Sequence, residues 1–473
     1  MGRFESGSYV LIMDNDTIAA ISTPVGIGGI GIIKISGKNA KNIVSLIFRK
    51  SKSKNTKRFL EESHKVYHGH IVDPDSKKAI DEVLLTVMLA PHSYTGEDVV
   101  EINVHSGIFL LKTILNIVLT KGARIAEPGE FTKRAFINGR IDLTQAEAII
   151  DIINAKSIKA LEIANAQVDG ELRNHVEKTL NILNNIFVKI EAAIDFPDAE
   201  ECVSLEADII IIENVVINKL NELISGYNEG HVIREGIKLV IAGRPNVGKS
   251  SLMNSLLQKE RAIVTSIPGT TRDVIEETII ISGIPAIISD TAGLHDTIDP
   301  VESIGIKKAR EQINNSDVIL FVIDASSSFN EDDRRLFESI KNKLLIVVYN
   351  KIDLLTENHS FEICEEIKKY PMVKVSSLYN TGMDCLKENI KEIVIKDIDY
   401  SRLDIVPNLR QKIALEKCLE NMVLVSKGIK DMLPYELISI DLAEAIESLN
   451  QVVGNMAKPD LLDQIFSRFC IGK

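Results

Sequence analysis

The stretch that decides the fold is "IKLVIAGRPNVGKSSLMNSLL", residues 237–257. A short β-branched apolar run precedes a glycine loop and a helical pattern follows it, which is the context in which G-x-x-x-x-G-K-[ST] binds phosphate. The motif residues are Gly243, Gly248, Lys249 and Ser250. Backbone N–H groups of such a loop bind phosphate oxygens, the lysine neutralises them, and the hydroxyl coordinates magnesium. The stretch therefore predicts a Ras-like α/β P-loop domain.

Four further segments fit a domain that binds GTP. The loop "IPGTTRD" (267–273) resembles a switch segment that the γ-phosphate orders, with Thr271 on the same magnesium. "PAIISDTAG" (285–293) ends a strand at Asp290, a second-sphere magnesium carboxylate. "LLIVVYNKID" and "VKVSS" follow, and the Asp353 carboxylate would accept from the N1–H and 2-amino groups of guanine but not from adenine. The predicted nucleotide-binding residues are Asn246, Val247, Gly248, Lys249, Ser250, Ser251, Thr265, Ser266, Ile267, Pro268, Gly269, Thr270, Thr271, Asp290, Thr291, Ala292, Gly293, Asn350, Lys351, Asp353, Ser376 and Ser377.

The residue after "DTAG" bears on catalysis. A Ras-like enzyme carries a glutamine there to orient the attacking water, whereas this chain has Leu294, which cannot do so. Asn246 could instead hold a monovalent cation beside the nucleotide, and Glu302 could position the water. From the residues alone, Glu302 fits a solvated glutamate at a helix start better.

Bulk properties narrow the class of protein. The chain has 473 residues, which predicts two to four domains, and a formal net charge of −12. That charge argues against non-specific nucleic-acid binding as the main role, so a nucleic-acid substrate would need a local basic surface or a second protein. No apolar run approaches 18 residues and the N-terminus lacks the order of a signal peptide, so we expect a cytoplasmic protein. Five cysteines without a C-x-x-C pair predict reduced thiols.

Hydrophobic periodicity predicts the domain order. Residues 141–233 and 396–473 have helical spacing of apolar residues and read as two parts of one all-α domain, into which the P-loop domain, 234–395, is inserted. Residues 1–140 contain short β-branched runs such as "DVVEINVH" and predict an α+β domain. The glycines at 26–31 make only a weak dinucleotide fingerprint. His68 and His70 share a strand face but have no convincing third metal ligand.

The end of the sequence, "FCIGK" at 469–473, leaves three interpretations open. Cys470 could be a buried structural thiol, since free cysteines are often buried. A lipidation box is a poor match, because Gly472 and Lys473 do not fit its pattern. The third interpretation is a functional segment.

Taken together, these motifs resemble one family. The segments "SYTGEDVVEINVH", "PGEFTKRAFINGRIDLTQAEAI", "EAAIDFPD", "GRPNVGKSS", "PGTTRD", "DTAG" and "FCIGK" are similar to those of the tRNA modification GTPases MnmE/TrmE, over residues 14–473. The resemblance implies a homodimeric, potassium-stimulated GTPase that works with the flavoprotein MnmG/GidA, in a heterotetramer, on the wobble uridine of certain tRNAs. A carboxymethylaminomethyl or aminomethyl group would be added. Its one-carbon unit would come from 5,10-methylene- or 5-formyl-tetrahydrofolate bound by an N-terminal domain that also dimerises.

The resemblance also implies roles for single residues. Glu302 would position water and Cys470 would act as an acid or nucleophile. The folate contacts would be Lys34, Glu101, Arg140 and Lys473. Magnesium would be held by Ser250 and Thr271, and potassium by Asn246, Thr265, Ile267 and Thr270.

Two positions depart from the family pattern. Ile27 stands where the family usually has an arginine in Pro-Gly-Arg-Gly-Gly, and His295 stands where an arginine is common. An alternative function is a ribosome-assembly or other regulatory GTPase that acts only as a binding switch. The terminal cysteine and the N-terminal domain separate the two hypotheses, because a pure switch requires neither.

Overall fold

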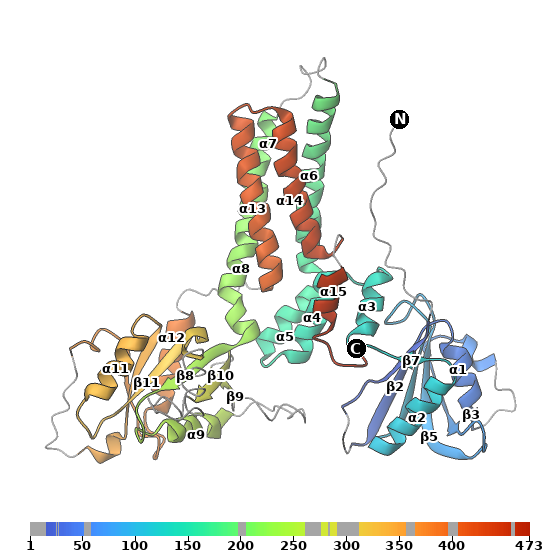
Figure 1. The fold of residues 1–473 in the computed structure, drawn as a ribbon, viewed down its shortest axis with the longest axis horizontal. Helices are drawn as coiled ribbons and strands as arrows, with labels where there is room; N and C mark the ends of the chain where they lie inside the picture. The colour runs from blue at the N-terminus through green and yellow to red at the C-terminus, as the bar shows by residue number, and fades with distance from the viewer. Residues whose placement is uncertain are drawn as a thin grey trace, which may run out of the picture. The chain divides into compact units, whose positions relative to one another are not determined.

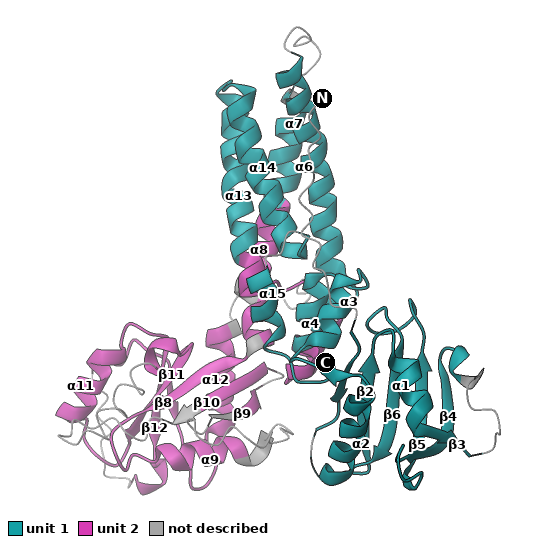
Figure 2. Cartoon of the chain, turned by 45° about the vertical axis from the view of Figure 1, so that its right-hand side comes forward, with its two compact units in different colours: residues 1–150, 167–218, 413–473 teal, residues 151–166, 219–412 magenta. Residues whose placement is uncertain are grey.

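The computed structural model forms two compact units, residues 1–150, 167–218 and 413–473 and residues 151–166 and 219–412 (Figure 2). The structure describes residues 16–24, 26, 28–51, 58–196, 205–260, 276–281, 284–290, 312–355, 365–395, 405–455 and 459–473. Within this part of the chain, no helix is long and apolar enough to cross a membrane.

The first unit contains a seven-stranded sheet of order β3-β4-β5-β6-β2-β1-β7 (Figure 1). All neighbouring strands are antiparallel except β1 and β7. The strands are β1 (Ile18–Ile21), β2 (Ile30–Ser36), β3 (Phe48–Lys50), β4 (Lys65–Val72), β5 (Ala79–Met88), β6 (Val99–His105) and β7 (Arg124–Ile125).

Helices α1 (Ala40–Ile47) and α2 (Ile108–Thr120) cover one face of this sheet. Strand residues that alternate along the chain, such as Ile33 and Ile102, are fully buried against them. Because side chains alternate between faces, Lys34 and Glu101 lie on the other face, opposite each other in the β2–β6 register. The predicted α+β domain is confirmed.

The same unit contains a long helical bundle. Helix α6 (Glu171–Asp195) packs along α14 (Tyr435–Val453). Leu183, Ile186 and Ile190 are buried at three- and four-residue spacing, as the periodicity predicts. The other helices are α3 (Glu130–Ile137), α4 (Leu143–Asn154), α7 (Glu206–Ile211), a π-helical turn (Ile212–Ile217), α13 (Leu409–Lys430) and α15 (Pro459–Phe466); α4 and α13 each continue into the second unit.

The second unit is built on a six-stranded sheet of order β13-β12-β11-β8-β10-β9, parallel except for the β9–β10 pair. Buried clusters lie on both faces, which explains the continuous apolar strands. The strands are β8 (Ile237–Ala242), β9 (Glu276–Ile281), β10 (Ile284–Asp290), β11 (Val318–Asp324), β12 (Leu345–Asn350) and β13 (Met372–Lys374). The helices are α5 (Ile158–Val168), α8 (Asn218–Glu235), α9 (Lys249–Glu260), α11 (Glu331–Ile340) and α12 (Met383–Ile395), of which α5 and α8 extend into the first unit. The order β8, loop, α9 confirms the prediction from residues 237–257.

Candidate functional site

The glycine loop between β8 and α9 has the backbone that phosphate binding needs. Asn246 and Gly248 have positive φ, 64° and 95°, so the loop turns sharply before α9 begins at Lys249. Lys249 Nζ donates to the carbonyls of Gly243 and Arg244 at 2.8 and 3.1 Å. The ammonium group is therefore held over the loop whose N–H groups would bind phosphate oxygens.

A buried asparagine connects this loop to the predicted guanine site. Asn350 ends β12 and its Nδ2 donates to the Val247 carbonyl at 2.9 Å. Its Oδ1 accepts from the backbone N–H and the hydroxyl of Ser377, at 3.1 and 3.0 Å. The Ser376 hydroxyl donates to Asp353 Oδ1 at 2.5 Å. These contacts bring together three segments that lie far apart in the sequence.

Lys351 and Asp324 form an additional link that the sequence did not reveal. Lys351, at φ 64°, donates from Nζ to the Asn246 carbonyl at 2.5 Å and to Asp324 Oδ2 at 2.7 Å. Burial opposes ionisation of Asp324, but hydrogen bonds from Lys351 and Ser326 outweigh it and lower the pKa of this carboxyl. Asp324 thus stays ionised and orients the lysine across the P-loop.

Part of the predicted nucleotide site lies outside the described residues. For Asp290 only the backbone, at the end of β10, is described. Of the residues predicted to hold magnesium or potassium, the structure describes only Ser250 and Asn246. The residues outside the description are Thr265, Ser266, Ile267, Pro268, Gly269, Thr270, Thr271, Thr291, Ala292, Gly293, Leu294, His295 and Glu302.

A second candidate site lies on the face of the N-terminal sheet opposite the one that α1 and α2 cover. Lys34 Nζ is 3.6 Å from Glu101 Oε1 and lies over the rings of Tyr94 and Phe131, at 5.3 and 5.4 Å from their centroids. The Arg140 guanidinium lies 5.1 Å from the Tyr94 centroid, and its Nη1 donates to the Tyr94 carbonyl at 2.6 Å. Tyr94 therefore connects the predicted residues Lys34 and Arg140. The sequence did not predict this role for Tyr94, which was noted only as part of the segment "SYTGED".

Lys473 belongs to the same neighbourhood. Burial lowers the pKa of Lys34; the nearby Glu101 carboxylate opposes this, while the positive charge of Lys473 lowers the pKa further. The structure thus brings together all four residues predicted to bind folate. Three cationic side chains, those of Lys34, Arg140 and Lys473, with the single carboxylate of Glu101 favour an anionic ligand.

The end of the chain is held against the N-terminal sheet of the same unit. Ile471 forms an antiparallel bridge with Pro128, and the Ser22 hydroxyl donates to the Gly472 carbonyl at 3.1 Å. Phe469 is buried and packs on Phe466 of α15, with ring centroids 5.5 Å apart. Cys470 is exposed, so its interpretation as a buried structural thiol is wrong. Packing of its neighbours presents this thiol to solvent.

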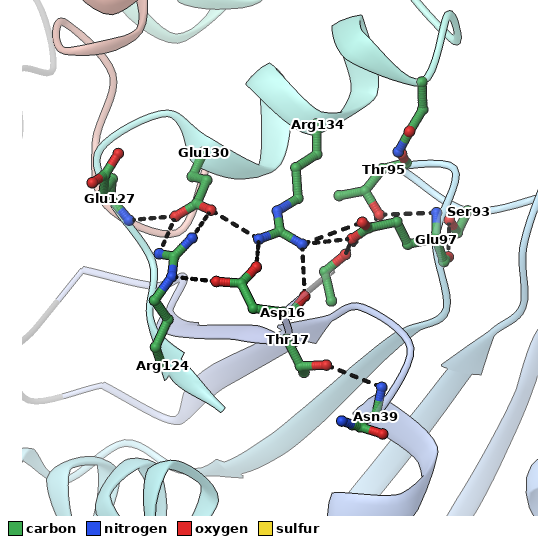
Figure 3. A network of polar contacts seen from close by, with 12 residues as sticks. Asp16, Thr17, Asn39, Ser93, Thr95, Glu97, Arg124, Glu127, Glu130 and Arg134 are labelled. Carbon is green, nitrogen blue, oxygen red and sulfur yellow. Dashed lines mark hydrogen bonds and ion pairs between the residues drawn. The ribbon is translucent and has the colours of Figure 1, made fainter. Parts of the chain in front are cut away.

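A buried arginine is the centre of a charge network in the same domain (Figure 3). Arg134 on α3 is 1% exposed and binds Asp16 and Glu130 through Nη2, at 2.6 and 2.9 Å, and Glu97 through Nη1 at 3.2 Å. Arg124 bridges Glu130 from the other side, Nη1 to Oε2, at 2.8 Å. Because Glu97 lies in the loop that carries Tyr94, this charge network positions the aromatic residue of the site. Sequence reasoning missed the network, since a fully buried arginine has no distinctive local pattern.

The histidines considered as metal ligands have other neighbours. His68 Nε2 lies 2.7 Å from Glu82 Oε1, and the His68 and His70 rings are 6.5 Å apart. Across the described ranges, no group of three or more His, Cys, Asp or Glu residues is placed to hold a metal ion.

The fold and the P-loop define a multidomain P-loop GTPase. Comparison with known proteins specifies its family. Residues 17–140 match the family model of the GTP-binding protein TrmE N-terminus, and residues 143–470 match that of the MnmE helical domain. The chain belongs to the MnmE family of tRNA modification GTPases.

Two relatives of this family are similar over their whole length. The tRNA modification GTPase MnmE of Carboxydothermus hydrogenoformans is 46% identical over 98% of this chain and 100% of its own. The MnmE of Desulforamulus reducens is 44% identical, with the same coverage. Among solved structures, Era of Aquifex aeolicus is 29% identical over 40% of this chain and 67% of its own, with a TM-score of 0.28.

Proposed function

We propose that this GTPase modifies the wobble uridine of certain tRNAs together with the flavoprotein MnmG/GidA, adding a carboxymethylaminomethyl or aminomethyl group. The observation that carries the proposal is the docked C-terminal segment, which brings Lys473 near Lys34 and Glu101. A GTPase that acts only as a switch needs no such second site. The relatives' shared name supports tRNA as the substrate.

The second site has the chemistry of a folate site. A tetrahydrofolate carries a planar ring with N–H donors and a glutamate tail with carboxylates. Glu101 can accept from the ring, the cations Lys34, Arg140 and Lys473 can bind the carboxylates, and Tyr94 offers an aromatic surface. Bound there, 5,10-methylene- or 5-formyl-tetrahydrofolate would supply the one-carbon unit. Ser22 and Pro128 keep the C-terminal segment in place beside it.

Cys470 is proposed as an acid or nucleophile of the modification step. It is exposed between two residues whose contacts fix the backbone, Phe469 and Ile471. A thiol needs both access and a defined position to react with a bound substrate.

Some of the residues proposed to act on the nucleotide lie in the described part of the chain, and others lie outside it. Ser250 and Thr271 would hold magnesium, and Asn246, Thr265, Ile267 and Thr270 would hold potassium. Glu302 would position the attacking water, since Leu294 cannot. A homodimer, and a heterotetramer with MnmG/GidA, are proposed on the family resemblance, as is a cytoplasmic location.

The test is nucleoside mass spectrometry of bulk tRNA from cells that lack this protein, complemented with wild type or Cys470→Ser. We expect wild type alone to restore the modified wobble uridine. Restoration by both would support the proposed role in tRNA modification and show that the Cys470 thiol is not needed for the reaction. Failure of both, with expression shown by immunoblot, would favour the regulatory-switch hypothesis.

A further inference from the structure

A basic pocket lies at the edge of the N-terminal sheet, away from the residues of the proposed folate site. It has a volume of about 300 Å³ and is lined by Arg49, Lys50, Ser51, His70 and Ala79. None of these described lining residues is acidic, although the whole chain has a net charge of −12. Strand β3, which carries Arg49 and Lys50, is the outermost strand, so the pocket is on an edge of the sheet.

The sheet holds the donors of this pocket in place. Arg49 lies opposite His70 in the β3–β4 register, and the Ser51 N–H donates to the His68 carbonyl at 3.2 Å. Arg49 Nη2 donates to the Lys77 carbonyl at 3.4 Å, which uses one of the five N–H groups of a guanidinium. The Lys50 ammonium lies 5.0 Å from the centre of the Tyr67 ring. Because side chains alternate along a strand, Arg49 and His70 lie on one face of the sheet and Lys50 on the other. Arg49, Ser51 and His70 are therefore the lining residues that can donate on the same face.

Two carboxylates near the pocket have hydrogen-bond partners of their own. Glu82, opposite His70 in the β4–β5 register, is paired with His68 at 2.7 Å. Asp73, in the turn after β4, accepts from the backbone N–H groups of Asp75 and Ser76 at 2.9 and 3.4 Å. In sequence, residues 49–58 read "RKSKSKNTKR", with six Lys or Arg and no acid. Residues 49–58 therefore contribute positive charge and no negative charge to the sequence around the pocket.

We propose that this pocket binds a phosphate group of the tRNA backbone. The inference rests on the proposed function, which makes tRNA the substrate. A guanidinium binds two phosphate oxygens at once, and the hydroxyl and imidazole can donate to others. Such contacts orient an RNA without reading its bases, and each releases counterions. An acidic protein can hold tRNA in this way through one local cationic surface.

The test compares tRNA binding by the full-length protein and a double variant, Arg49→Gln with Lys50→Gln, by filter binding at a series of salt concentrations. Glutamine keeps side-chain length and removes charge. The matched control is Lys38→Gln with Lys112→Gln, which removes the same charge from two exposed lysines of the same domain. GTP turnover, measured on all three proteins, should be equal because it depends on the P-loop domain.

We expect the pocket variant to bind tRNA several-fold more weakly at low salt. The slope of log affinity against log salt should become shallower by about 0.7 to 0.9, since the pocket is proposed to hold one phosphate and each lost phosphate contact accounts for about that much. The control should keep the wild-type slope. Equal slopes for the wild type and the pocket variant would overturn the phosphate pocket and leave the proposed function standing. A wild-type protein that binds no tRNA at low salt would overturn both.

Discussion

At the scale of the residue, the candidate nucleotide site includes side chains that position other residues of the site. Asp324 is such a residue, because its ion pair with Lys351 orients the amine that also donates to Asn246. Asp324→Asn should raise the Kd for GTP about 3- to 10-fold, since the lost hydrogen bond involves two charged groups. Titration with a fluorescent GTP analogue measures this, and Asp332→Asn, an exposed carboxylate on α11, is the control. Equal affinity for both variants would show that Lys351 is oriented without Asp324.

Tyr94 gives a second prediction at this scale. Lys34 and Arg140 both lie against its ring, so the ring rather than the hydroxyl should matter for ligand binding. Tyr94→Phe should bind 5-formyl-tetrahydrofolate within about twofold of wild type, whereas Tyr94→Leu should bind about tenfold more weakly. Isothermal titration calorimetry distinguishes them. A large loss in Tyr94→Phe would instead assign the role to the hydroxyl, which pairs with Thr132 at 2.9 Å.

At the scale of the element, the charge network around Arg134 ties the start of β1, the β5–β6 loop and α3 to one another. Burial opposes ionisation of Glu130, but hydrogen bonds from Arg124, the Glu127 N–H and Arg134 outweigh it and lower the pKa of the carboxyl. A lowered carboxyl pKa stabilises the fold above the ordinary glutamate range. That stabilisation is lost as the pH falls through the folded-state pKa.

The prediction concerns the unfolding of this domain in acid. Wild type should lose stability as the pH falls below about 4.5, while Glu130→Gln should start less stable, by about 3 to 5 kcal/mol, and lose less on further acidification. Thermal unfolding at pH 7 and pH 4 measures both. Glu62→Gln, an exposed partner of Lys65, should follow the wild type. Parallel losses in wild type and Glu130→Gln would contradict the assignment.

Docking of the C-terminal segment depends on one glycine. Gly472 has φ 92°, and a Cβ there would lie 2.6 Å from the Ile21 carbonyl oxygen. Gly472→Ala should detach the segment, so carboxypeptidase should release Lys473 at least several-fold faster, while GTP turnover is unchanged. Gly122→Ala is the matched control, because Gly122 also has positive φ, 111°, but has no atom within 4 Å of the added Cβ. Equal release rates would show that the segment tolerates the side chain.

At the scale of the whole molecule, the P-loop and the residues of the proposed folate site lie in different compact units. A substitution in one site should therefore leave ligand binding at the other unchanged. Lys249→Ala should abolish GTP turnover, because the phosphate charge loses its cation, and should leave folate affinity within about twofold. Turnover assays and calorimetry on the same preparation measure both. Retained turnover would contradict the assignment of the P-loop as the GTP site, and lost folate binding would show that the variant is misfolded.

Features that a local sequence pattern encodes could be predicted, whereas features that arise from contacts between distant residues could not. The P-loop was predictable because Gly243, Gly248 and Lys249 are read within one strand, loop and helix. The helical bundle was predictable because burial in α6 repeats at three and four residues. Exposure of Cys470 was not, because it follows from the contacts that Phe469 and Ile471 make with α15 and Pro128. Tyr94 and Arg134 were missed for the same reason, since their partners come from several elements.

The contact between Ser22 and Gly472 spans 450 residues, and this separation has a consequence for biosynthesis. At ribosomal rates of about 5 to 20 residues per second, roughly 20 to 90 s pass between synthesis of the two partners. During that time the N-terminal sheet has emerged with β1 and the Pro128 edge uncovered. The proposed ligand site of this domain is therefore completed only after Gly472 has been synthesised, as one of the last events in the maturation of a nascent chain.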